Sequence, residues 1–130
     1  MKSCHDGHIA LLDGETDVDL LYEVVIGGSI NSKTEIRRSK QHLPPVHTVY
    51  GAYLDCTQFI EFWINWDDSY VNISQSMGHP FFIWKSGFKL GTITNIGIHT
   101  GLGSIGEWKF NYKGIIFITT SHVLVCLNMS

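Results

Sequence analysis

The chain has 130 residues, of which 44% are hydrophobic and 16% are charged, and its formal net charge is −3. A chain this apolar can bury enough surface to offset its ordering entropy, which excludes an intrinsically disordered protein, and its length fits one domain. Nucleic acid is not expected as a partner, because its binders carry strong basic patches and only Arg37, Arg38 and Lys40 cluster here.

The sequence leaves the compartment open between extracellular and cytoplasmic. No apolar run reaches the roughly 20 residues that span a bilayer, and the N-terminus lacks the apolar core of a signal peptide. The three cysteines, Cys4, Cys56 and Cys126, are far apart and odd in number, so we interpret them mostly as free thiols, with a bridge between two of them left open. Asn72 and Asn128 begin N-x-S sequons, which matter only if the chain is secreted.

In the first half of the chain, alternating residues and turn signals predict short strands. These strands are His8–Leu12, Leu20–Ile26 and Thr34–Ser39. The last two are predicted to form a hairpin in which Val24 lies opposite Ile36. Glu23 then lies opposite Arg37 on the other face, where the two side chains are expected to form a cross-strand ion pair.

Residues 39–53 contain two prolines and little periodicity, which predicts a loop. The strands predicted beyond it are Phe59–Trp66, Tyr70–Ser74, Phe81–Trp84, Thr92–Thr100 and Glu107–Tyr112. Short strands separated by turn signals predict an all-β fold, a single antiparallel β-sandwich or jelly-roll-like domain over residues 1–130. The alternation also predicts that Trp66 and Trp108 are buried and that Trp63 is more exposed.

Residues Gly101–Gly106 spell G-x-G-x-x-G, the pattern of a dinucleotide or S-adenosylmethionine loop. Such a loop needs a helix after it and an acidic partner for the ribose. Glu107–Tyr112 alternates as a strand, and no Asp or Glu follows Glu107. We therefore interpret the motif as a glycine-rich turn and expect no cofactor.

Four metal-ligand types, Cys4, His5, Asp6 and His8, occur within five residues. Zinc sites usually take their ligands from two separate segments, and no second pair is evident, so the sequence predicts no metal site and a disordered N-terminus. With seven histidines spread along the chain, no catalytic constellation stands out from chance, and no catalytic residue is predicted.

Trp63 shares one face of its predicted strand with Glu61 and Asn65, and Asp67 follows in the turn. An indole beside hydrogen-bonding side chains is typical of a sugar-binding surface, where the apolar ring stacks on the sugar. The alternative is that another sheet or loop covers Trp63. Glu61 and Asp67 could also support glycosidic cleavage as a pair of carboxylates, although a solvated strand face explains them better.

Several segments resemble the farnesoic acid O-methyltransferase domain family, in consistent order over about residues 6–110. The matching stretches are Asp6–Leu12, Tyr22–Gly28, Asn31, Ile36–Arg38, Phe62–Ile64, Pro80–Trp84, Ile96–Ile98 and Gly106–Phe110. The resemblance implies methyl transfer from S-adenosylmethionine to a sesquiterpenoid acid of juvenile hormone chemistry. It also implies a β-rich accessory or recognition module, and it adds Asn31 and Arg37 to the candidate ligand-binding residues.

The chain departs from the family pattern at both ends. A strand usual upstream of His8 is missing, and residues 111–130 form an apolar extension. The β-branched stretch Ile115–Leu127 is predicted to be a strand that fills the gap in its own sheet or pairs with a second copy as a homodimer.

The sequence leaves three candidate functions for this chain. The first is a non-catalytic recognition module, lectin-like and binding a glycan or another small molecule. Its candidate ligand-binding residues are Glu61, Trp63, Asn65, Asp67, Asn31 and Arg37. The second is an S-adenosylmethionine-dependent farnesoic acid O-methyltransferase, and the third is a protein-interaction domain without a small ligand.

Overall fold

The computed structural model describes residues 1–16, 20–38, 44–67, 69–75, 79–87, 91–101, 103–112, 115–120 and 125–128. Over these residues the chain is almost entirely β, with one short helical turn, α1 (Gly28–Asn31). The strands are β1 (Lys2–Ser3), β2 (Gly7–Leu12), β3 (Leu20–Gly27), β4 (Lys33–Arg37), β5 (His47–Tyr50), β6 (Trp63–Trp66), β7 (Tyr70–Ser74), β8 (Pro80–Lys85), β9 (Asn95–Thr100), β10 (Gly106–Tyr112), β11 (Ile115–Thr120) and β12 (Val125–Asn128). No helix of the described residues is long and apolar enough to cross a membrane.

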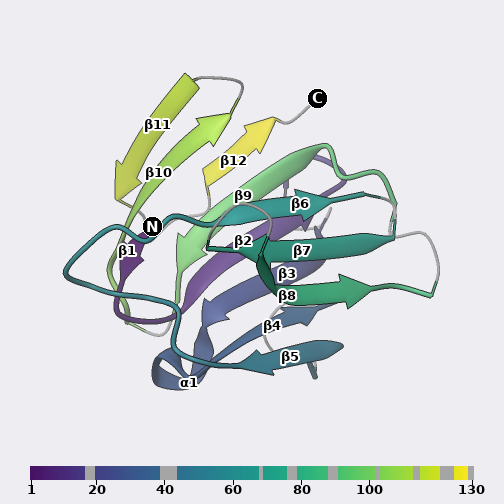
Figure 1. Ribbon diagram of the computed structural model, residues 1–130. Helices are drawn as coiled ribbons and strands as arrows, with labels where there is room; N and C mark the ends of the chain where they lie inside the picture. Colours follow the sequence, from purple (N-terminus) through teal and green to yellow (C-terminus); the bar gives the residue numbers. More distant parts are fainter. Residues whose placement is uncertain are drawn as a thin grey trace.

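The strands form three antiparallel sheets. The largest has the order β12-β9-β2-β3-β4-β5, and the two smaller ones have the orders β6-β7-β8 and β1-β10-β11. Figure 1 shows β6, β7 and β8 lying across the front of the six-stranded sheet, while β1, β10 and β11 lie toward one end. The predicted all-β sandwich is confirmed.

The core fills the space between the six-stranded sheet and β6-β7-β8. Its fully buried side chains come from both layers and are Leu11, Val24, Ile26, Ile36 and Ile98 on one side and Val71, Ile73 and Phe82 on the other. Each such side chain stabilises the fold by about 1.5–3 kcal/mol relative to an exposed one. The period-two pattern of the sequence therefore determines which face of each strand turns inward.

The hairpin predicted from the first half of the chain is confirmed in its register. Val24 lies opposite Ile36, and Glu23 lies opposite Arg37. The side chains on that second face make other contacts than expected, because Glu23 points to two histidines and Arg37 forms an ion pair with Glu35.

The structure adds one strand that was not predicted and shortens others, since β9 begins at Asn95 rather than Thr92. Within the predicted loop, β5 forms a strand that pairs with β4, while residues 39–43 lie outside the described part. Because β5 is an edge strand and only half-buried, its residues need no strict alternation, which is why the pattern missed it. Phe59–Trp66 is a strand only from Trp63 onward, since the Ile60 N–H donates to the Met1 carbonyl in a separate local pairing.

The N-terminal segment is ordered, contrary to the prediction of a disordered end. β1 pairs with β10, and the Met1 ammonium donates a hydrogen bond of 2.8 Å to the Ile60 carbonyl. Cys4 and Cys56 form a disulfide, which corrects our interpretation of the cysteines as mostly free. Cysteine spacing alone does not determine which residues are bridged, so this pair could not be identified from the sequence.

The tryptophans follow the predicted alternation with one exception. Trp108 is 3% exposed and Trp63 is 43% exposed, as expected. Trp66 was expected to be buried but is only partly so, because β6 is the edge of a three-stranded sheet. It still packs against the core from the side.

The C-terminal extension is part of the fold. β11 pairs with β10, and β12 pairs with β9 at the edge of the six-stranded sheet. The single strand predicted over Ile115–Leu127 is instead two, β11 and β12, and both pair within the chain.

Deleting residues 114–130 is expected to cause aggregation and lower the melting temperature. Removing β11 and β12 leaves β10 and β9 with unpaired backbone edges, and such edges pair readily with other chains. Size-exclusion chromatography and thermal unfolding measure the effect. A truncated protein that stays monodisperse and equally stable would show that the extension is dispensable.

Candidate functional site

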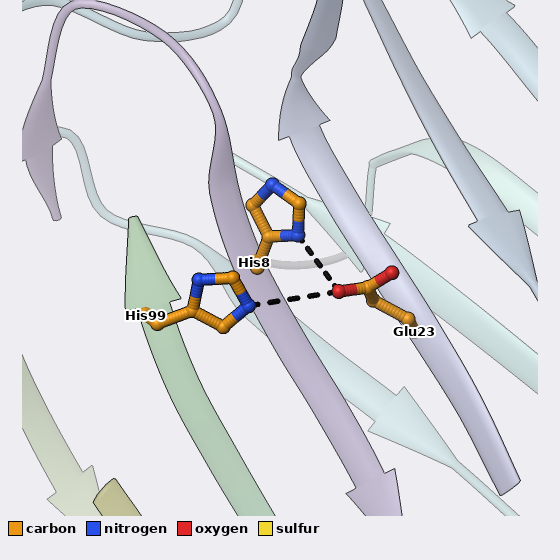
Figure 2. Close-up of side chains that lie close together, drawn as sticks. All are labelled: His8, Glu23 and His99. Atoms are coloured by element: carbon orange, nitrogen blue, oxygen red, sulfur yellow. Dashed lines mark hydrogen bonds and ion pairs between the residues drawn. The ribbon is translucent and has the colours of Figure 1, made fainter. Parts of the chain in front are cut away.

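Three side chains of functional type, His8, Glu23 and His99, meet on the six-stranded sheet. They come from β2, β3 and β9, which are adjacent in the sheet order. His8 lies directly opposite His99, and Glu23 lies diagonally from His8 because its own partner on β2 is Ala10. Figure 2 shows the three side chains meeting from neighbouring strands. Alternation with the core residues Ile9, Val24 and Ile98 places them on the opposite face of the sheet.

The two histidines turn toward the same carboxylate oxygen. His8 Nδ1 lies 2.8 Å from Glu23 Oε1, and His99 Nε2 lies 3.6 Å from it. The imidazole rings are stacked, with centroids 4.3 Å apart and an angle of 25° between their planes. His8 and Glu23 have side chains that are 1% and 7% exposed, whereas that of His99 is 32% exposed. The site is therefore reached from solvent beside His99.

Glu23 is ionised despite its burial. Desolvation by burial raises its pKa, but hydrogen bonds from His8 and His99 and their charges outweigh that effect and lower the pKa to about 2, from an ordinary value of 4.5. Two buried atoms of this cluster, Glu23 Oε2 and His8 Nε2, have no hydrogen-bond partner in the described structure. A buried carboxylate oxygen without a partner has capacity for another ligand.

A second ion pair cluster lies on the same face, on β4. Glu35 is 1% exposed, and its carboxylate contacts Lys33 Nζ at 2.9 Å and also the Arg37 guanidinium. Buried ionisable groups gather at functional sites more often than elsewhere, because a structural role alone seldom compensates their desolvation. This face of the sheet is thus the chemically distinctive part of the described fold.

The ligand-binding residues predicted on and beside β6 lie together, but on a different sheet from the His8–Glu23–His99 cluster. Glu61, Trp63, Asn65 and Asp67 are all exposed, along the strand at the edge of the small sheet. Asp67 Oδ1 accepts hydrogen bonds from the backbone N–H groups of Ser69 and Tyr70, at 2.7 and 3.1 Å, and so shapes the turn into β7.

Asn31 and Arg37, suggested by the family resemblance, are not brought together with the β6 residues. The Asn31 side chain donates to the Leu54 carbonyl at 2.8 Å and accepts from the Tyr53 and Leu54 N–H groups, which ties α1 to the segment after β5. Arg37 lies on the ionic face of the six-stranded sheet. The six predicted residues therefore fall in three separate places.

Sequence reasoning missed the His8–Glu23–His99 cluster. His8 and His99 come from nearly opposite ends of the chain, and only the β2–β9 pairing brings them together. The sequence did offer a signal, however, because His8, Glu23 and His99 are polar residues beside runs of apolar residues in strands.

The glycine motif is a connection between strands, as predicted. Gly101–Gly106 leads from β9 into β10 rather than into a helix. Gly101 lies against the site, because a Cβ there would be 2.7 Å from His8 Nε2. Beside the loop is an open depression of about 430 Å³ lined by Lys2, Cys4, His5, Cys56, Gly103, Ser104, Ile105 and Glu107.

Comparison with known proteins identifies the family. The family model described as farnesoic acid O-methyl transferase matches residues 1–113, and the chain belongs to this family. No curated protein and no solved structure matches the chain.

Glu23 is expected to stabilise the protein in a pH-dependent way. Because its pKa is lower in the folded state, its contribution is complete above about pH 4.5 and is lost as the pH falls toward 2. A shift of this size corresponds to about 3 kcal/mol at most. The difference in unfolding free energy between wild type and Glu23→Gln, from urea titrations in EDTA, should shrink over that range.

Glu61→Gln serves as the control, because Glu61 is exposed. Its difference from wild type should stay small and nearly constant over the same range. A Glu23→Gln difference that does not change between neutral pH and pH 2 would contradict the assignment.

Proposed function

We propose that this member of the farnesoic acid O-methyltransferase family is a non-catalytic recognition module that binds carbohydrate on the outer face of β6-β7-β8. The observation that carries the proposal is the exposed indole of Trp63, a large apolar ring that is 43% accessible on a sheet face. Trp combines a flat apolar surface with one N–H donor, which suits the C–H face and the hydroxyls of a sugar.

The neighbours of Trp63 on that face support a sugar rather than a protein partner. Asn65 lies opposite Asn72, and Asn72 lies opposite Ile83, which is 50% exposed. We call Trp63, Asn65, Asn72 and Ile83 the outer platform. The exposed Asn65 amide can both donate and accept hydrogen bonds, as hydroxyl groups require, whereas the Asn72 Oδ1 is buried. None of the four residues is charged.

The proposed roles differ among the residues chosen from the sequence. Trp63 stacks on the ligand, Asn65 bonds its hydroxyls, and Glu61 borders the outer platform two residues before β6 begins. Asp67 acts through the turn that its carboxylate holds. Asn31 and Arg37 lie on α1 and β4, outside the β6-β7-β8 sheet, and are given no role in this proposal.

The Cys4–Cys56 disulfide supports an extracellular place for such recognition. Disulfides persist in oxidising compartments and are rare in the reducing cytosol. A homodimer is also part of the proposal, since β12 forms one edge of the six-stranded sheet and edge strands can pair with a second copy.

A glycan array is expected to show binding that Trp63→Ala lowers at least about tenfold, the loss expected when a stacking residue worth roughly 1.4 kcal/mol is removed. Tyr50→Ala is the matched control, because Tyr50 is an exposed aromatic residue on a different sheet, at 78% exposure. Protein made without N-glycosylation is required, since a glycan on Asn72 would cover the outer platform.

Failure of every glycan to bind, or equal binding by Trp63→Ala, would refute the carbohydrate proposal. An array without hits would favour the interaction-domain alternative.

Methyl transfer is the second candidate, and family membership is what favours it. Calorimetry with S-adenosylhomocysteine is expected to show no saturable binding, because the glycine motif lacks the helix that holds such cofactors. A micromolar isotherm that Ile105→Glu, at the rim of the depression, abolishes would establish a cofactor site and favour the enzyme.

A further inference from the structure

The cluster of His8, Glu23 and His99 has the composition of a metal centre. Two imidazole nitrogens and a carboxylate oxygen lie within 4.8 Å of one another. Figure 2 shows that His8 Nδ1 and His99 Nε2 both point to Glu23 Oε1 from neighbouring strands. Each ligand is carried on a paired strand of a sheet, which holds their backbones at fixed separations.

We propose that His8, Glu23 and His99 bind a divalent transition-metal ion of the zinc class. In tetrahedral zinc sites the bonds to nitrogen and oxygen are about 2.0–2.2 Å, which places neighbouring ligand atoms about 3.3 Å apart. The two histidine–carboxylate separations of 2.8 and 3.6 Å lie on either side of that value. The two imidazole nitrogens lie within 4.8 Å of each other, so side-chain rotations that bring them to the same spacing would complete the site.

The burial of Glu23 is the second observation that supports a metal site. Glu23 is 5% exposed, and its Oε2 has no hydrogen-bond partner in the described structure. An unsatisfied buried acceptor costs about 1–3 kcal/mol, and more when it is charged. A cation held at Oε1 would neutralise the carboxylate within the sheet, and bidentate binding by Glu23 would give Oε2 a partner as well.

The ligand set defines the class of ion. Neutral imidazole suits zinc, copper, nickel and cobalt, whereas calcium and magnesium prefer sites made of oxygen atoms. With only three protein ligands in the cluster, a fourth position remains for water or an external group. His99, with its partly exposed side chain, provides the way in.

The site is distinct from the N-terminal group of Cys4, His5, Asp6 and His8. Cys4 is bridged to Cys56, and His5 Nδ1 contacts Asp6 Oδ2 at 2.5 Å. His8 is the one residue of that group that belongs to the cluster, and its alternation on β2 turns it to the face of Glu23 and His99.

The test is a titration of the EDTA-treated full chain with Zn²⁺ by calorimetry. One ion per chain is expected to bind, with His99→Ala and Glu23→Gln each weakening binding at least about tenfold. His79→Ala, at an exposed position outside the cluster, should bind as wild type does, and so should His5→Ala. Ca²⁺ and Mg²⁺ should give no saturable binding.

Two measurements on the wild type keep the test independent of variant folding. Zn²⁺ should raise its melting temperature by mass action, and Co²⁺ should give the visible absorption of a low-symmetry, nitrogen-ligated ion. Failure of Zn²⁺ to bind stoichiometrically would overturn the proposal and leave a histidine–glutamate network without an ion. Equal binding by His99→Ala and Glu23→Gln, or loss of binding in His5→Ala alone, would overturn it too. Glycan binding by the outer platform does not depend on either result.

Discussion

The Glu23 carboxylate carries a negative charge in a strand that is buried on both faces, and the surrounding structure must balance that charge. Residues Tyr22–Gly27 of β3 are all buried, and the strands on either side are largely buried as well. An isolated buried carboxylate would be protonated rather than remain charged. His8 and His99 keep it ionised, and they do so only while β2 lies between β3 and β9. The charge balance thus depends on the strand order itself.

The two faces of the six-stranded sheet differ in their side chains. One face buries aliphatic side chains against β6-β7-β8, which stabilises the fold without defining a partner. The other carries Glu23 and Glu35 with the basic groups that contact them. Burying ion pairs stabilises a protein little in net terms, because desolvation offsets much of the attraction. Two carboxylate clusters on one sheet face are therefore better explained by a role beyond stability.

The sequence predicted those strands and pairings that depend on alternation and turn residues within a short segment. The β2, β3, β7 and β10 segments and the Val24–Ile36 register all follow from alternation and turn residues a few positions apart. The Cys4–Cys56 disulfide, the strand β5 and the meeting of His8 with His99 depend on contacts between distant segments, and alternation carries no information about these. For the same reason the sequence could place Trp63 on an exposed face but could not bring Asn72 and Ile83 beside it.

Family membership and the described geometry bear on different questions. The family description names a methyl transfer, a reaction that needs a bound methyl donor held beside its acceptor. The described residues bring together two imidazoles and a carboxylate, which are acid–base and metal-binding groups rather than a cradle for a nucleoside. The loop that spells the cofactor motif is used to carry the chain from β9 to β10, with Gly101 packed against His8. Each glycine of the motif therefore has its own structural explanation: Gly101 lies against His8, Gly103 has a positive φ of 76°, and Gly106 lies against the Thr100 side chain. The motif by itself gives no reason to place a nucleotide there.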